Sequence, residues 1–289
     1  MLYVLVLLTG TLNAADPYGK DGADPYGKDG AATLTAQAGD WDTKDLSIGD
    51  PVTVGGVTIY PVIDEDAPKH VTAQTASLSS AMSSGMLTVR ESDNDGYTAV
   101  QMVNHSKQPV FVMAGEVIRG GRQDRMITED VIVPPQEHPL VVQVHCVEQG
   151  RWSDTAANFT YGGRAEYALR EVLEEGGNQD TTWSVVAALN TARDADPSGA
   201  YVAAGGPEWL QYRQQLRTQL AEADQVVGAV VAHNGQLVHA EMFGDPMTAA
   251  VSRAVALDGY ARDAVVMDGA VNDIHDDDVV EAFLLSEID

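Results

Sequence analysis

The chain has 289 residues, with 17 Lys and Arg against 43 Asp and Glu, so its formal net charge is -26. This charge makes nucleic acid and anionic membrane surfaces poor partners, because both repel an acidic protein. Hydrophobic residues make up 44% of the chain, enough for a buried core, which excludes a wholly disordered protein. The five Lys and twelve Arg fit either a surface kept soluble in high salt or an ordinary well-solvated acidic surface.

Residues 1–15 have the pattern of a secretory signal. An apolar run at residues 2–8 precedes Leu12-Asn13-Ala14, which allows cleavage after Ala14 or Ala15. The run is shorter than the roughly 20 apolar residues of a membrane span. No Lys or Arg precedes the run, so a start inside a longer leader is the alternative. We expect a secreted, periplasmic or cell-surface protein with no membrane span.

Residues 16–45 read as a low-complexity linker. The unit Asp-Pro-Tyr-Gly-Lys-Asp-Gly-Ala occurs twice in tandem, at residues 16–23 and 24–31. Its Pro and Gly break helices, and nothing in it can bury a core. The Asp-Gly pairs raise the alternative of a calcium loop, but the ligand spacing of an EF-hand is missing.

The folded part is predicted at residues 46–289, and it begins with strands. Gly55-Gly56 separates two apolar runs at residues 51–54 and 57–63, which indicates a hairpin. A short helix at residues 77–84 is expected to end at Gly85. Further strands are expected at residues 86–91, 97–104, 110–114, 126–133 and 140–147.

Helical patterns follow Trp152, at residues 164–175, 182–193 and 207–223. Asn234-Gly235 then predicts a second hairpin between residues 226–232 and 237–243. Helices at residues 246–264 and 278–286 complete the pattern. Strands first, then helices and one late hairpin, predict a single α+β domain with a mixed or antiparallel sheet.

The first candidate site leaves an apolar strand and carries three arginines in an otherwise acidic chain, in the string Gly115-Glu116-Val117-Ile118-Arg119-Gly120-Gly121-Arg122-Gln123-Asp124-Arg125. Glycine lets a backbone approach a ligand closely, and Arg donates forked hydrogen bonds to carboxylate or phosphate. One interpretation is an anion-binding loop with Glu116 as acid or base. The other is a structural network of ion pairs, with Glu116 partly buried.

The second candidate site is the string Cys146-Val147-Glu148-Gln149-Gly150-Arg151-Trp152, which also ends an apolar strand. Strand alternation points His145 and Cys146 to opposite faces, so a thiol–imidazole pair is not expected. Cys146 is the only cysteine, which excludes an intramolecular disulfide. Arg151 and Trp152 fit either stacking on a planar ligand or a cover over the core.

Standard catalytic and cofactor motifs do not fit. Gly121-Arg122 stands where a phosphate-binding loop needs Lys and Ser or Thr, and no Gly-x-Gly-x-x-Gly string occurs. The seven His residues lack the spacing of metal ligands, although His233 and His239 flank the late turn. We therefore predict no cofactor and no metal.

Together these strings resemble the ARG and Rhodanese-Phosphatase-superfamily-associated Protein (ARPP) domain family. The resemblance runs from about Leu46 to about Val266, and residues 46–50 and 224–229 add to it. Its name records association with ADP-ribosylglycohydrolases, which implies a role near NAD-derived nucleotides. The resemblance implies a fold and a polar set rather than a reaction: Glu116, Arg119, Gln123, Asp124, Arg125, Glu148, Arg151 and Trp152.

Two functions follow from the sequence. The first is a secreted domain that binds a small anionic, nucleotide- or ADP-ribose-like ligand through Arg119, Gln123, Asp124, Arg125, Arg151 and Trp152. A hydrolytic step there would use Glu116 or Glu148 as general base. The second is a non-catalytic extracellular surface or assembly module, which includes self-association, in which the Arg and Glu residues form structural ion pairs. The sequence does not decide whether the protein is an enzyme.

The signal interpretation makes a direct prediction. When the full chain is expressed in a host that recognises its leader, the exported protein should begin at Ala15 or Asp16. Intact-mass measurement of the protein from the medium or periplasm checks this. Recovery of the uncleaved chain from the cytoplasm alone would contradict it.

Overall fold

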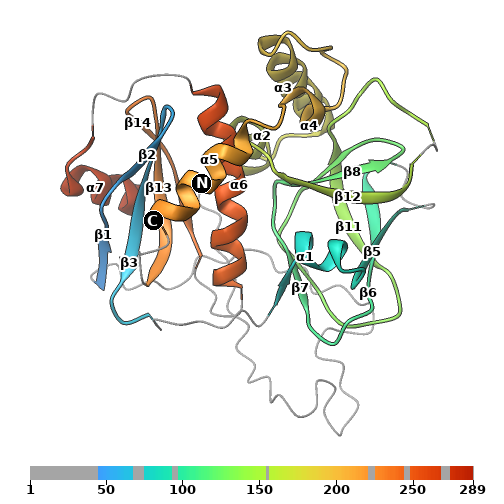
Figure 1. The fold of residues 1–289 in the computed structure, drawn as a ribbon, viewed down its shortest axis with the longest axis horizontal. Helices are drawn as coiled ribbons and strands as arrows, with labels where there is room; N and C mark the ends of the chain where they lie inside the picture. Colours follow the sequence, from blue (N-terminus) through green and yellow to red (C-terminus); the bar gives the residue numbers. More distant parts are fainter. Residues whose placement is uncertain are drawn as a thin grey trace, which may run out of the picture.

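The structure is a computed structural model that describes residues 45–67, 75–92, 97–153, 156–220, 225–243, 248–267 and 274–288. The predicted signal and nearly all of the predicted linker lie outside the described residues. Helix α6 (Ala249–Val266) stands between two groups of strands (Figure 1). Among the described helices, none combines the length and hydrophobicity needed to cross a bilayer.

The first sheet has five antiparallel strands in the order β1-β3-β13-β14, with β2 added to β3. These strands are β1 (Leu46–Ile48), β2 (Val52–Val54), β3 (Val57–Asp64), β13 (Val226–His233) and β14 (Gln236–Met242). Both predicted hairpins are confirmed. Gly55, Asn234 and Gly235 have φ of 58°, 49° and 84°, the left-handed backbone that such turns require.

The second group of strands consists of a six-stranded sheet, in the order β12-β8-β9-β11-β6-β5, and a three-stranded sheet, in the order β10-β7-β4. The larger sheet contains β5 (Leu87–Glu91), β6 (Ala99–Asn104), β8 (Glu116–Gly121), β9 (Arg125–Ile127), β11 (Leu140–Cys146) and β12 (Ala156–Arg164). The smaller sheet contains β4 (Ala76–Ser77), β7 (Val110–Val112) and β10 (Val131–Val133).

Two expectations for this region were wrong. The single strand expected at residues 126–133 is two strands, β9 and β10, which belong to different sheets. The chain turns between them, and the buried carboxylate of Asp130 accepts a hydrogen bond from the distant Ala114 amide at 2.7 Å. The segment expected as a glycine-containing turn contains β8, which pairs with the unpredicted β12 through an irregular register. The glycines in both strands hide the strand pattern.

Seven helices occur in the described residues: α1 (Leu78–Ser83), α2 (Tyr167–Glu174), α3 (Gln179–Ala192), α4 (Tyr201–Ala204), α5 (Trp209–Gln219), α6 and α7 (Asp277–Ile288). The Ser77 and Asn178 side chains cap α1 and α3 by accepting backbone N–H bonds. α2 begins three residues later than expected because Arg164 completes β12. The short α4 was not predicted.

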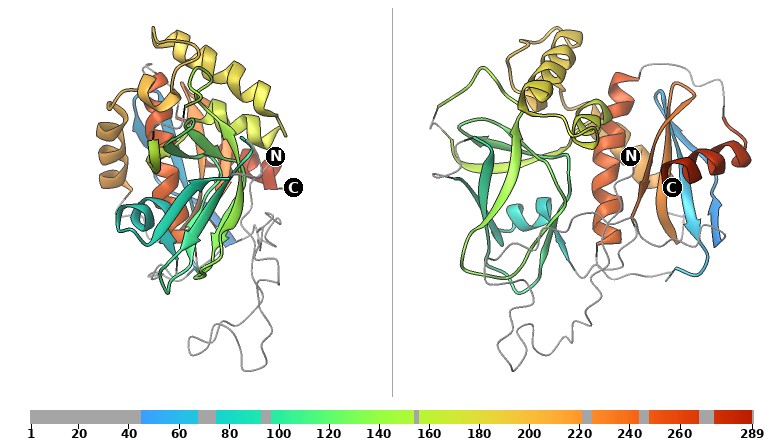
Figure 2. Two further views of the ribbon diagram at one scale, coloured as in Figure 1. Left: turned by 90° about the vertical axis from the view of Figure 1, so that its right-hand side faces the viewer. Right: turned by 180° about the vertical axis from the view of Figure 1, so that it is seen from behind.

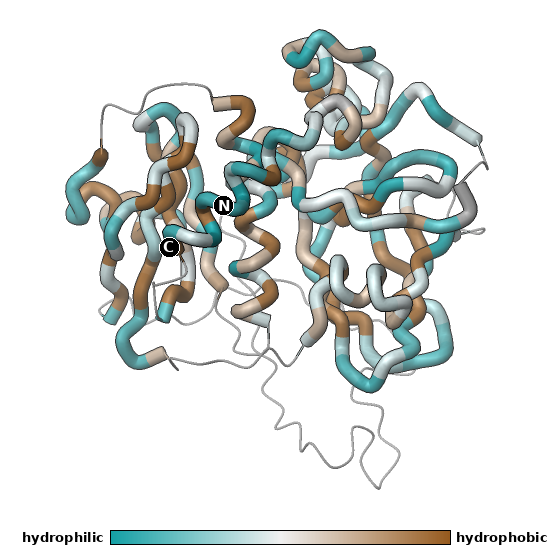
Figure 3. Tube along the Cα trace, in the orientation of Figure 1, coloured by the Kyte–Doolittle hydropathy of each residue, from teal (hydrophilic) through white to brown (hydrophobic). Residues whose placement is uncertain are grey.

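Helix α6 is buried on two sides, whereas a surface helix buries a single apolar face. Val251 and Val255 pack with Phe111 against the three-stranded sheet. Ala256 and Tyr260 belong instead to the core under the first sheet. The view from behind in Figure 2 shows α6 between the two groups of strands, and Figure 3 shows hydrophobic segments along it. This shared helix joins the strands into one α+β domain, as the sequence predicts.

Gly259 of α6 provides a test of this packing. A Cβ atom there would collide with Arg170 Nη1, which donates to the Ala165 carbonyl at 2.9 Å and is itself buried. Gly→Ala normally stabilises a helix by about 1 kcal/mol. Here we expect Gly259→Ala to lower the free energy of unfolding by about 1–3 kcal/mol, because it overpacks the core.

Urea denaturation checks this expectation. The control is Ala254→Gly, at an exposed position of the same helix, which should cost only about 1 kcal/mol. A Gly259→Ala protein more stable than the wild type would contradict the packing of α6 against Arg170.

Candidate functional site

The two predicted strings meet at one end of the six-stranded sheet. β8 and β9 pair with Ile118 opposite Arg125, and β9 and β11 pair with Arg125 opposite Cys146. The loops that follow β8 and β11 are therefore neighbours. Gly120 and Gly121 have φ of 125° and 55°, a backbone that strains other residues, so the turn itself requires this glycine pair.

The Arg151 guanidinium lies at the centre of the contact between the two loops. It donates to both carboxylate oxygens of Glu148, at 2.8 and 2.5 Å, and lies 3.2 Å from Asp124 Oδ1. It also donates to the carbonyls of Gly121 and Gly120, at 2.7 and 3.3 Å. The glycines that the sequence suggested for ligand approach thus present their carbonyls to the protein's own arginine.

Arg125 is fully buried and pairs with Glu91, at the end of β5. Its Nη2 lies 3.1 Å from Glu91 Oε2, and Glu91 Oε1 accepts the Arg122 backbone N–H at 2.6 Å. The Gln123 side chain is internal as well, since it accepts from Arg125 and donates to the Gln149 carbonyl. The sequence did not indicate Glu91, which lies 34 residues before its partner.

We call Glu91, Asp124, Arg125, Glu148 and Arg151 the motif network. Its cations and carboxylates bind one another, and the Glu148 carboxylate also accepts the Asp124 N–H at 3.1 Å. Burial raises the pKa of Asp124, although its hydrogen bond from the Gly120 N–H opposes this. The hydrogen bonds to Glu148 raise the pKa of Arg151. The network therefore joins the two loops through ion pairs and hydrogen bonds.

Three further side chains lie at these loops and at the end of β8, and we call Arg119, Arg122 and Trp152 the rim. Trp152 is 56% exposed, and the Arg122 guanidinium lies 5.7 Å from the centre of its ring. The buried Arg125 approaches the same ring at 6.0 Å. The Arg119 side chain is 48% exposed, and its only ion pair within the described residues is a 3.9 Å contact with Asp124.

The structure does not bring Glu116 together with these groups. Glu116 begins β8, whereas the motif network lies beyond the Gly121 end of the strand. A strand rises about 3.3 Å per residue, so roughly 16 Å separates the two ends. Glu116 and Glu148 are therefore not a pair of carboxylates that act on one substrate.

Glu116 closes the turn that precedes β8. The sequence predicts a partly buried Glu116, and the structure buries it fully. Its Oε2 accepts the Met113 N–H at 2.7 Å. Tyr161, which lies beside Glu116, donates to Asp258 at 2.9 Å. Burial raises the pKa of Glu116 to about 8, so its carboxyl carries a proton at neutral pH.

Comparison with known families adds to this geometry. The profile of the ARG and Rhodanese-Phosphatase-superfamily-associated Protein domain matches residues 45–286. The chain belongs to this family. No curated protein and no solved structure matches it. In this ARPP domain, the two strings that carry the resemblance thus meet at adjacent loops, which one ion-pair network joins.

A second buried charge cluster of the ARPP domain was missed by the sequence analysis. Arg164 pairs with both oxygens of Glu241, at 2.6 and 3.0 Å, and Tyr260 donates to Glu241 at 2.8 Å. Burial alone would raise the pKa of Glu241, but the Arg164 guanidinium outweighs it and holds that pKa well below its usual value. The sequence feature that could have indicated this cluster is a single charged residue, Glu241, between Ala240 and Met242 in a predicted strand.

A cavity of about 10 Å³ adjoins this cluster and is lined in part by Asp130, Arg164 and Glu241. That volume holds about one water molecule. Burial raises the pKa of Asp130 to about 6, while Glu241 stays ionised. The cavity is too small for an organic ligand, so we assign the cluster a structural role.

The remaining candidates in the ARPP domain have internal partners. Cys146 is buried, and burial raises its pKa to about 11, which favours the inert thiol that the sequence predicts. His145 contacts Thr182 at 2.8 Å. His233 and His239 both lie against the ring of Tyr167. Within the described ranges, no group of three or more His, Cys, Asp or Glu side chains is arranged to hold a metal ion.

Glu116 makes a prediction for stability against pH. Its folded pKa of about 8 exceeds the ordinary value of 4.5, so the folded state binds the proton more tightly. The stability that Glu116 contributes is complete below pH 4.5 and falls by about 1.4 kcal/mol per pH unit up to about pH 8. Glu116→Gln cannot ionise, so its stability relative to the wild type should rise over this range.

Urea denaturation of both proteins at several pH values between 5 and 8 measures the difference. Glu148→Gln is the control, because it weakens the pair with Arg151 and should lower stability without this gain at higher pH. A constant difference between Glu116→Gln and the wild type would show that Glu116 is ionised in the fold.

Proposed function

We propose that this ARPP domain is a ligand-recognition module and that its rim binds a small, planar, anionic ligand of the nucleotide or ADP-ribose class. The observation that carries the proposal is the half-exposed indole of Trp152, with the Arg122 guanidinium 5.7 Å from its ring and the half-exposed Arg119 on the strand that leads into the same loop. The motif network contacts this surface from the protein interior, through Arg125 beside the Trp152 ring and Asp124 beside Arg119.

The rim combines the two kinds of contact that such a ligand needs. An exposed indole offers an aromatic face for a base, and base–aromatic stacking contributes about 1–3 kcal/mol. Arginine donates paired hydrogen bonds to phosphate oxygens. In a chain of net charge -26, the two rim arginines, Arg119 and Arg122, place positive charge beside the indole, which favours an anion.

Binding is better supported here than hydrolysis. The Glu148 carboxylate accepts three bonds from Arg151 and the Asp124 N–H, so it has little freedom to take a proton from water. Glu116 lies at the far end of β8 and is fully buried. The catalytic roles predicted for these two residues are therefore not part of the proposal.

A second function rests on the same network. Arg125 closes on Glu91, and Arg151 closes on Glu148 and Asp124, which is the pattern expected of an extracellular surface or assembly module with purely structural ion pairs. In that case the rim would contact another protein, or a second copy of this one, rather than a small molecule.

We also propose that the protein is secreted, periplasmic or attached to the cell surface. The support is the apolar run at residues 2–8 with a cleavage position after Ala14 or Ala15, followed by a repetitive linker. An exported domain meets little NAD, so its ligand would be an extracellular anion that shares the planar, charged chemistry of ADP-ribose.

Calorimetric titration with ADP-ribose, NAD and phosphate at low and high salt tests the rim. We expect ADP-ribose to bind best, and Trp152→Ala to weaken its Kd by about tenfold or more through lost stacking. Arg119→Gln should weaken it and reduce the salt dependence. Lys107→Gln removes one exposed positive charge elsewhere and should leave the Kd unchanged.

Two outcomes would oppose the ligand proposal. One is the absence of heat and of thermal stabilisation with all three compounds at millimolar concentration. The other is equal binding by the wild type and Trp152→Ala. Sedimentation of the wild type and Trp152→Ala then tests the assembly module, which predicts self-association that depends on this side chain.

A further inference from the structure

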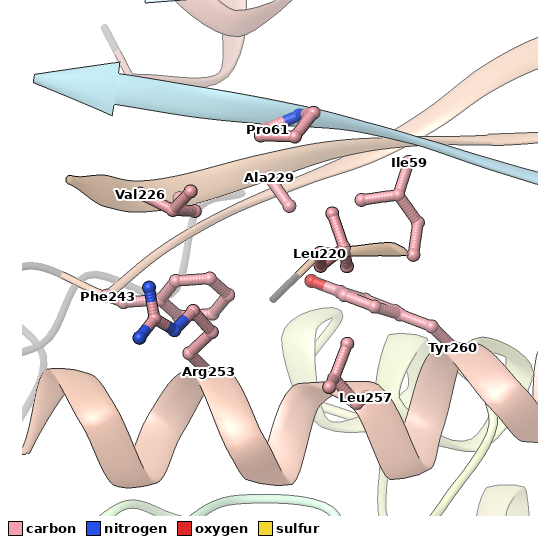
Figure 4. Close-up of a pocket in the computed structure, with 10 residues that line it drawn as sticks. Ile59, Pro61, Leu220, Val226, Ala229, Phe243, Arg253, Leu257 and Tyr260 are labelled. Atoms are coloured by element: carbon pink, nitrogen blue, oxygen red, sulfur yellow. The ribbon is translucent and has the colours of Figure 1, made fainter. Parts of the chain in front are cut away.

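An apolar pocket lies between the first sheet and α6 (Figure 4), whereas the motif network belongs to the group of strands on the other side of α6 (Figure 1). Its walls include Ile59 and Ala229 from the sheet, Leu220 after α5, Phe243 after β14, and Leu257 and Tyr260 from α6. The cavity measures about 20 Å³, which is room for only one or two methyl-sized groups. It therefore suits the end of an apolar group rather than a whole cofactor.

One charged side chain lines this otherwise apolar pocket. Arg253 extends from α6, and its guanidinium lies beside the Phe243 ring at one end of the pocket (Figure 4). Arg253 is half-buried, yet no hydrogen bond, ion pair or ring contact joins it to another residue in the described part of the chain. Every other half-buried or buried arginine of the described ranges has such a partner.

Within the described residues, an arginine without such a contact is notable, because Asp and Glu outnumber Lys and Arg by 43 to 17 in the sequence. A half-buried guanidinium has lost part of its hydration, and a carboxylate would restore its hydrogen bonds. The adjoining pocket accepts carbon but offers little polar surface, since the Tyr260 hydroxyl already donates to Glu241 at 2.8 Å. The two features together define a ligand that is charged at one end and apolar at the other.

We infer that this pocket is a second binding site for a small monocarboxylate. The alkyl end of this ligand packs against Leu220, Phe243 and Leu257, and its carboxylate binds Arg253. The site is independent of the rim, because it uses a different arginine on a different element. It also differs in chemistry, since it selects an apolar tail where the rim selects a planar polyanion.

Binding of hexanoate by the full chain tests the inference, with acetate and hexanol as comparison ligands. Acetate supplies the charge without the tail, and hexanol supplies the tail without the charge. We expect hexanoate to bind at least about tenfold more tightly than hexanol, because it adds one charge-assisted contact, and at least about tenfold more tightly than acetate, because it buries an apolar tail. Methyl NMR should show shifts at Val226 and Leu257 with hexanoate, and none at Val142 in the six-stranded sheet.

Arg253→Gln should weaken hexanoate binding by about tenfold while leaving hexanol binding unchanged. Arg217→Gln is the matched control, because Arg217 is an exposed arginine on the nearby α5, and it should bind hexanoate as the wild type does. Trp152→Ala should also bind hexanoate normally, which separates this site from the rim.

Any of several results would overturn the inference: no hexanoate binding at millimolar concentration, equal affinity for hexanoate and hexanol, or full binding by Arg253→Gln. Shifts confined to methyl groups outside the pocket would do the same. None of these results depends on whether ADP-ribose binds at the rim, so the two sites succeed or fail separately.

Discussion

The ion pair between Arg164 and Glu241 joins β12, an edge strand of the six-stranded sheet, to β14, an edge strand of the first sheet. Tyr260 of α6 donates to the same carboxylate, and Arg164 Nε donates to the Ala114 carbonyl at 3.1 Å. Burying two charges costs several kcal/mol per ion, so such a pair is tolerated only when its remaining donors and acceptors are also satisfied. Movement of either sheet alone would break these bonds, which fixes α6 and the turn closed by Glu116 in place.

The positions of the two proposed sites follow from this arrangement. The motif network occupies the outer end of the six-stranded sheet, where loops can vary without disturbing α6. The apolar pocket lies on the other side of that helix, and Tyr260 forms part of its wall while holding Glu241. A conformational change at one site would have to pass through α6 and the buried pair of Arg164 and Glu241, so we expect the two sites to act independently.

The excess of arginine over lysine also has a structural explanation. Seven arginines of the described residues pair with buried or half-buried carboxylates: Arg119, Arg125, Arg151, Arg164, Arg170, Arg193 and Arg213. The guanidinium fork can bind two carboxylate oxygens and a carbonyl together, which a lysine ammonium does less well. Arginine is thus used mainly inside the protein, and this use is separate from the two interpretations of the acidic surface.

The sequence by itself determined the features that depend on neighbouring residues. Gly55-Gly56 and Asn234-Gly235 determine two hairpins because they admit positive φ, and Ser77 begins α1 by capping it. The two strings also identified the family and the two candidate loops. The structure then showed that these loops meet. Only the tertiary structure decided that Arg125 pairs with Glu91, that β9 and β10 belong to different sheets, and that Glu116 keeps its proton. Those outcomes depend on burial and on partners distant in the chain, and no local pattern encodes either quantity.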